Sequence, residues 1–84
     1  MITEYIDEAL KRAHYEKIND QEPFYGEVKE LKGVWASGIT LEECRENLKE
    51  VIEGWILLGI KKGLSIPKLG EINIVNLTEE KVND

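Results

Sequence analysis

Residues 38–55, GITLEECRENLKEVIEGW, carry the clearest structural signal in the chain. Thr40 is placed to cap the first free amides of a helix, and Glu43 can reach back to the amide of Thr40. Ile39 stands just outside this capping box, where we expect it to pack on Cys44 as a hydrophobic staple. A helix is therefore expected to begin directly after Thr40.

The residues that follow repeat with the period of an amphipathic helix, which we expect to run from Leu41 to Lys62. Such a helix is about 33 Å long, enough to cross a small sheet. Positive charge at Lys61 and Lys62, followed by Gly63 and Pro67, marks its end. The face expected to pack on a sheet consists of Leu41, Cys44, Leu48, Val51, Ile52, Trp55 and Leu58.

Five further segments show helix or strand patterns. Residues 3–12 are typical of a short amphipathic helix, and residues 14–19, 24–28 and 34–37 are predicted strands. The short connections between these strands favour an antiparallel meander. Residues 71–75 alternate and predict a fourth, edge strand. The prediction is one α+β domain of β-β-β-α-β order with an antiparallel sheet and one long helix, at residues 14–76, preceded by an N-terminal helix at 1–13 and followed by a disordered tail at 77–84.

The composition limits the function. The net charge of −6 argues against direct nucleic-acid binding, which depends on clustered Lys and Arg. It suits a soluble protein, or one that docks on a basic partner. No charged-then-apolar leader opens the chain, and no apolar run has the length of a membrane span. We therefore expect a cytoplasmic protein that contacts no membrane.

The sequence offers little for catalysis. Its single cysteine, Cys44, excludes an internal disulfide and is expected to be a buried structural thiol. Its single histidine, His14, has no nucleophile beside it in the sequence and is expected to be structural. No Cys-x-x-Cys, His-x-x-x-His or calcium-loop spacing occurs. We expect no enzymatic activity, no cofactor and no metal.

The end of the long helix has more apolar side chains than one sheet face can cover. The N-terminal helix has an apolar stripe of its own. Symmetric association is the commonest way to bury such a surplus, so we expect a dimer or a tetramer built from dimers. The predicted interface consists of Ile56, Leu57, Ile60, Ile2, Tyr5 and Ile6.

An ordered set of residues extends across most of the chain, from about Tyr15 to Pro67. It comprises Tyr25, Leu31-x-Gly33, Gly38-x-Thr40-x-Glu42-Glu43, Asn47-Leu48 and Trp55. In this order the residues resemble the HicB-type antitoxins and, more broadly, the HicB-like domain family. The resemblance implies a partial ribonuclease-H-like fold.

The chain departs from the family pattern in two places. Lys29 and Lys32 stand where the family usually has prolines. Only residues 75–84 follow the fourth predicted strand, which is too short for the DNA-binding module of longer members. Autorepression by this chain alone is therefore not expected.

The resemblance implies a function. HicB-like antitoxins inhibit small mRNA-cleaving toxins that need a basic RNA-binding surface. The resemblance therefore implies that this chain is a non-enzymatic antitoxin that masks a HicA-like toxin. The acidic charge of the chain fits a basic partner of this kind. The alternative is a stand-alone homo-oligomeric HicB-like module without a toxin.

The acids of the long helix have three possible roles. Ribonuclease H chemistry needs several carboxylates around two magnesium ions, and Glu16 is the only acid of the first predicted strand. Solvated charge explains the helix acids better than such a site does. A toxin-facing surface and a merely soluble one remain equally open. The acids that would face the toxin are Glu42, Glu46, Glu50 and Glu53.

Overall fold

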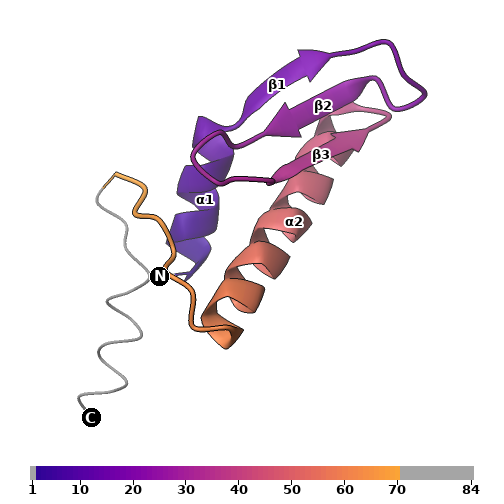
Figure 1. The fold of residues 1–84 in the computed structure, drawn as a ribbon. Helices are drawn as coiled ribbons and strands as arrows, with labels where there is room; N and C mark the ends of the chain where they lie inside the picture. The colour runs from indigo at the N-terminus through magenta and orange to yellow at the C-terminus, as the bar shows by residue number, and fades with distance from the viewer. Residues whose placement is uncertain (1, 71–84) are drawn as a thin grey trace.

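A computed structural model describes residues 2–70 of the chain (Figure 1). The predicted strand at 71–75 and the predicted tail lie outside the described residues. Two helices and three strands are present in this part, which confirms the α+β class. In chain order they are α1 (Ile2–Arg12), β1 (His14–Lys17), β2 (Phe24–Glu27), β3 (Trp35–Gly38) and α2 (Leu41–Lys61).

The three strands form one antiparallel sheet in the order β1-β2-β3, as the short connections predicted. In the register of the sheet, Tyr15 lies opposite Gly26, and Gly26 lies opposite Ala36. Residues directly opposite one another share a face, so these three residues point to the same side. That side is the one crossed by α2 (Figure 1).

The cap of α2 forms largely as predicted. The Oγ1 atom of Thr40 accepts a hydrogen bond of 3.0 Å from the amide of Glu43. The carboxylate of Glu43 accepts from the amide of Ile39 at 3.3 Å, one residue earlier than the predicted partner. The staple prediction is wrong, because the Ile39 side chain is 61% exposed while Cys44 is fully buried.

The backbone at the end of β3, at Gly38, lies against the backbone of α2 at Cys44. A Cβ atom at Gly38 would lie 2.8 Å from the Cα atom of Cys44, closer than such atoms approach in proteins. The Sγ atom of Cys44 lies 3.6 Å from the carbonyl oxygen of Ala36, in weak hydrogen-bond contact. The side-chain amide of Asn47 donates to the carbonyl of Ser37 at 2.9 Å. The first two turns of α2 are therefore tied directly to β3.

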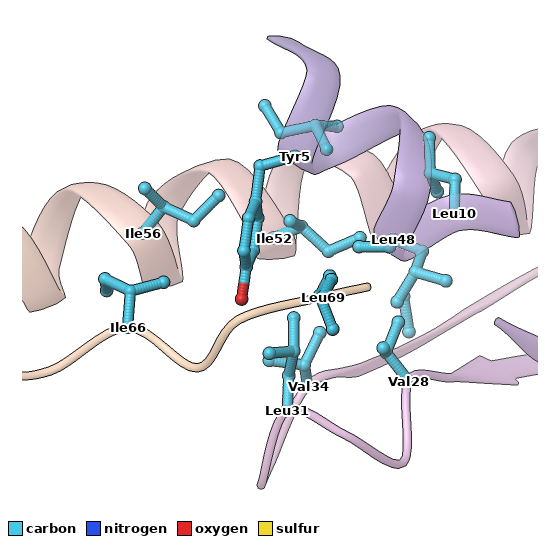
Figure 2. Close-up of a cluster of buried hydrophobic side chains, with 13 residues drawn as sticks. Tyr5, Leu10, Val28, Leu31, Val34, Leu48, Ile52, Ile56, Ile66 and Leu69 are labelled. Carbon is cyan, nitrogen blue, oxygen red and sulfur yellow. The ribbon is translucent and has the colours of Figure 1, made fainter. Parts of the chain in front are cut away.

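The hydrophobic core lies where α1, α2, the β2–β3 connection and residues 64–70 meet (Figure 2). The ring of Tyr5 inserts between α2 and the segment that follows it, and its hydroxyl donates to the carbonyl of Pro67. The core residues are Tyr5, Ile6, Ala9, Leu10, Val28, Leu31, Val34, Ala36, Leu48, Ile52, Ile56, Ile66 and Leu69.

The buried face of α2 is turned relative to the sequence prediction. Leu41, Val51 and Leu58 were expected inside but are 46%, 36% and 51% exposed, and Trp55 is only partly buried. The prediction considered a sheet alone, whereas α1 and residues 64–70 also pack on α2 and move its buried face toward them. The residues of α2 that are buried are Cys44, Leu48, Ile52, Ile56 and Gly59.

Two neighbouring positions on α2 test this orientation. Ile52→Ala is expected to lower the free energy of unfolding by about 2–5 kcal/mol, because it opens a cavity around a fully buried side chain. Val51→Ala is expected to change it by less than about 1 kcal/mol, because Val51 is 36% exposed. Urea denaturation of both variants measures the difference. Equal losses at the two positions would contradict the observed orientation.

Candidate protein-interaction site

The single histidine and the single cysteine lie on opposite faces of the sheet. A Cβ atom at Gly26 would lie 3.4 Å from the sulfur of Cys44, so Cys44 lies under the face that α2 covers. Tyr15 packs on the same side of Gly26. His14 precedes Tyr15 and lies opposite Glu27, which places it on the other face. The two side chains therefore form no nucleophile–base pair.

Cys44 has the environment of a structural thiol. Its side chain has no exposed surface. Burial raises the pKa of the Cys44 thiol, and the charge of Glu22 raises it further. Both effects disfavour the thiolate, which is the nucleophilic form. The predicted burial of this cysteine is confirmed.

The carboxylates that a ribonuclease-H-like site would need do not converge. Glu16 is exposed on β1. It lies on the face of the sheet that points away from α2, together with Tyr25, its partner on β2. The acids of α2 belong to the element on the opposite face. Within residues 2–70, no group of three or more His, Cys, Asp or Glu side chains gathers to hold a metal ion.

The four acids singled out in the sequence form an exposed row, here called the acidic ridge, made of Glu42, Glu46, Glu50 and Glu53. The first three are spaced by four residues, so they occupy successive turns. From first to last the ridge extends about 16 Å along the helix axis. In the described part of the chain, none of the four carboxylates forms an ion pair.

The predicted oligomer interface is largely wrong. Tyr5 and Ile56 have no exposed surface, and Ile6 is 5% exposed. Ile2 is partly buried against the same core. These side chains are used by the packing of α1 on α2 within one molecule, so they are not available to a second. Only two predicted interface residues stay exposed, Leu57 and Ile60.

An apolar surface nevertheless remains at the C-terminal end of α2. It is here called the helix-end patch and consists of Leu57, Leu58, Ile60 and Leu64, which are 60%, 51%, 37% and 60% exposed. A shallow pocket borders it, lined by Trp55, Leu58, Gly59, Lys62, Leu64, Ser65 and Ile66. Leu58 was expected in the core, and Leu64 was not among the expected interface residues. The continuous apolar run after Trp55 indicates that some apolar side chains must remain exposed. Because this run has no polar positions, it does not indicate which of its side chains are exposed.

The chain belongs to the UPF0150-like family, whose model matches residues 4–67. This range runs from the first turn of α1 to the segment that follows α2. The chain is also similar to a solved structure, the crystal structure of TTHA0281 from Thermus thermophilus. The two are 48% identical, the match covers 87% of this chain and 90% of the other, and the TM-score is 0.84.

None of the curated proteins compared with the chain matches it. Neither helix of residues 2–70 is both long enough and apolar enough to cross a membrane. The feature shared with the solved structure is thus the small α+β fold.

The thiol of Cys44 allows a direct test of the packing of α2 on the sheet. A thiol reagent at mildly alkaline pH is expected to modify the native chain more than about tenfold more slowly than the unfolded chain. Two causes act together: the sulfur is covered, and its raised pKa moves thiolate formation to higher pH than in the unfolded chain. Absorbance of the released chromophore follows the reaction. Equal rates with and without denaturant would refute the buried position.

Proposed function

We propose that this protein is a non-enzymatic HicB-like antitoxin that neutralises a small basic mRNA-cleaving toxin by covering its RNA-binding surface. Two lines of support are general: the resemblance of the residues between Tyr25 and Trp55 to HicB-type antitoxins, and membership of the UPF0150-like family. The observation that carries the proposal is the acidic ridge of α2.

The ridge has the chemistry that such a partner requires. A protein that binds RNA must offer lysine and arginine side chains to the phosphates, and those side chains also bind carboxylates. The ridge offers four exposed carboxylates that form no ion pair within the described residues, and its one neighbouring lysine, Lys49, lies a turn from Glu46 and Glu53. A toxin surface paired with this ridge is closed to RNA, so inhibition needs no chemistry from the antitoxin.

The rigidity of the ridge also favours binding. The capped N-terminus and the contacts with β3 hold α2 in place, so its exposed side chains start from a fixed backbone. Less conformational entropy is then lost on association. The net charge of −6 adds long-range attraction, which raises the association rate with a basic partner at low salt.

The first test uses the toxin that the proposal requires, a short basic reading frame with one catalytic histidine beside the gene. Glu46→Gln with Glu50→Gln is expected to weaken binding of that toxin about tenfold and to reduce rescue of growth on co-expression. The matched control, Glu4→Gln with Asp7→Asn, removes the same charge from α1 and is expected to change the affinity by less than about twofold. Titration calorimetry at two salt concentrations measures both.

Equal weakening by the two pairs would show that only bulk charge matters. The absence of any basic reading frame beside the gene would also count against the antitoxin proposal. It would favour the second candidate, a stand-alone homo-oligomeric module.

The helix-end patch is the observation that favours self-association. Its four side chains are at least one-third exposed, and two of them, Leu58 and Leu64, line an apolar pocket. Burying them against the same patch of a second copy forms a closed two-fold dimer. Glu53 lies one turn before Leu57 on the same side of α2, so such a dimer brings this end of the acidic ridge close to the interface and leaves Glu42 and Glu46 farther from it.

Light scattering during size-exclusion chromatography tests the dimer. The wild-type protein is expected to run as a dimer at micromolar concentration. Leu58→Glu with Leu64→Glu is expected to yield a folded monomer, because both side chains are at least half exposed and the buried carboxylates would be unpaired in a dimer. Ile56→Glu is unsuitable for this test, although Ile56 was expected in the interface, because its side chain belongs to the core.

The control for this test is Ile39→Glu with Leu41→Glu, which changes two exposed apolar residues at the other end of α2. This variant is expected to remain dimeric. A wild-type monomer, or a folded Leu58→Glu, Leu64→Glu dimer, would rule out association through the helix-end patch.

A further inference from the structure

The sheet has one face that no described helix covers. Of the two helices, only α2 packs on the strands, and it lies on the side of Gly26 and Ala36 (Figure 1). Successive side chains of a strand point to opposite faces, so the residues next to Gly26 and Ala36 in their strands point away from α2. The residues of this uncovered face are His14, Glu16, Tyr25, Glu27, Trp35 and Ser37.

Two aromatic rings stack at the centre of the uncovered face. The ring centroids of Tyr25 and Trp35 lie 5.8 Å apart, with an angle of 26° between the ring planes. Trp35 is 54% exposed, so much of its surface is open to solvent. Trp35 does not belong to the hydrophobic core, so its ring does not fill the interior of the fold.

Carboxylates border this aromatic pair on adjoining strands. Glu27 lies directly opposite Trp35, and Glu16 lies directly opposite Tyr25. Directly opposite side chains in an antiparallel sheet are close enough to interact. The pKa of the Tyr25 phenol is raised, first by its partial desolvation, then by the charge of Glu27 and a hydrogen bond to its carboxylate, and last by the charge of Glu16. Both acids therefore influence the same ring.

A third carboxylate lies beside the pair. Glu22 accepts a hydrogen bond of 2.7 Å from the hydroxyl of Ser37, the residue opposite Tyr25. Two cations belong to the other side of the sheet, because Lys17 lies over the ring of Phe24 and Arg45 is on α2. Lys29 and Lys32 lie in the connection between β2 and β3, beyond the end of this face. Among the described residues, His14 is the only basic side chain on the strands of the uncovered face.

This combination selects one kind of partner. A nucleic acid could stack on Trp35, but its phosphates would be repelled by the three carboxylates. A second copy of this chain, placed face to face, would bring the same carboxylates together. An arginine side chain fits both features, because its planar guanidinium stacks on aromatic rings and pairs with carboxylates.

We propose that the uncovered sheet face binds an arginine-containing segment of a basic protein partner, with a guanidinium stacked on Trp35 and paired with Glu27 or Glu16. This surface is separate from the acidic ridge, which is on α2 at the other side of the sheet. The proposal goes beyond the antitoxin function, since it holds whether or not the partner cleaves RNA. It gives the protein a second, chemically selective contact for a basic partner.

The test uses the full chain and an acetylated, amidated hexa-arginine peptide, so it does not depend on a toxin. Titration followed by NMR is expected to shift the indole N–H signal of Trp35 and the amide signals of β1, β2 and β3. A peptide of the same length in which citrulline replaces arginine is expected to cause no saturable shift, because citrulline has the shape of arginine without its charge.

Variants with matched charge separate a specific contact from bulk attraction. Glu16→Gln with Glu27→Gln is expected to weaken hexa-arginine binding at least about threefold. Glu46→Gln with Glu50→Gln removes equal charge from the acidic ridge and is expected to have a smaller effect. Trp35→Ala is expected to weaken binding about two- to fivefold, and Trp35→Phe less, since it retains a ring.

Three results would overturn the proposal. They are shifts confined to α2, equal weakening by the two glutamate pairs, and equal binding of the citrulline peptide. The shift map of the wild-type chain decides the first of these without any variant. Amide spectra recorded without peptide confirm that each variant is folded.

Discussion

The structure depends on the direct contact between the end of β3 and the first turns of α2. Gly38 has no side chain, so the strand approaches the backbone of the helix at Cys44, where a methyl group would clash. The hydrogen bond from Asn47 to Ser37 and the cap at Thr40 hold the same junction. With its N-terminus held here, α2 has one orientation relative to the sheet. That orientation determines which side chains enter the core and which remain available to partners.

This orientation separates three surfaces with different chemistry. The acidic ridge lies along the exposed side of α2, the helix-end patch lies at its C-terminal end, and the uncovered sheet face lies on the other side of the strands. Because like charges disfavour contacts between acidic faces of two copies, the helix-end patch is the surface best suited to self-association. The ridge and the sheet face are suited to basic partners. The two proposals thus assign basic partners to the ridge and the sheet face, and self-association to the helix-end patch.

Helix α1 is an integral part of the hydrophobic core. Tyr5 is fully buried, and its hydroxyl joins the segment after α2 through the carbonyl of Pro67. Together with Ile66 and Leu69 from that segment, α1 covers the apolar side of α2 that extends beyond the sheet. The apolar side chains that the sequence predicted to be in excess, on α1 and at the end of α2, are thus partly buried within one molecule. What remains exposed is smaller and is shifted toward Leu58 and Leu64.

The sequence alone determined the features that depend on residues close together in the chain. These are the cap at Thr40 and Glu43, the limits of α2 to within one residue, the strand segments, and the meander that short connections require. The exposed position of the four ridge acids also follows from helical spacing. Only the tertiary structure decided which side of α2 is buried, because that depends on α1 and on residues 64–70, distant in sequence. The stack of Tyr25 on Trp35 is of the same kind: the two residues meet only through the register of β2 against β3, and no local pattern specifies that register.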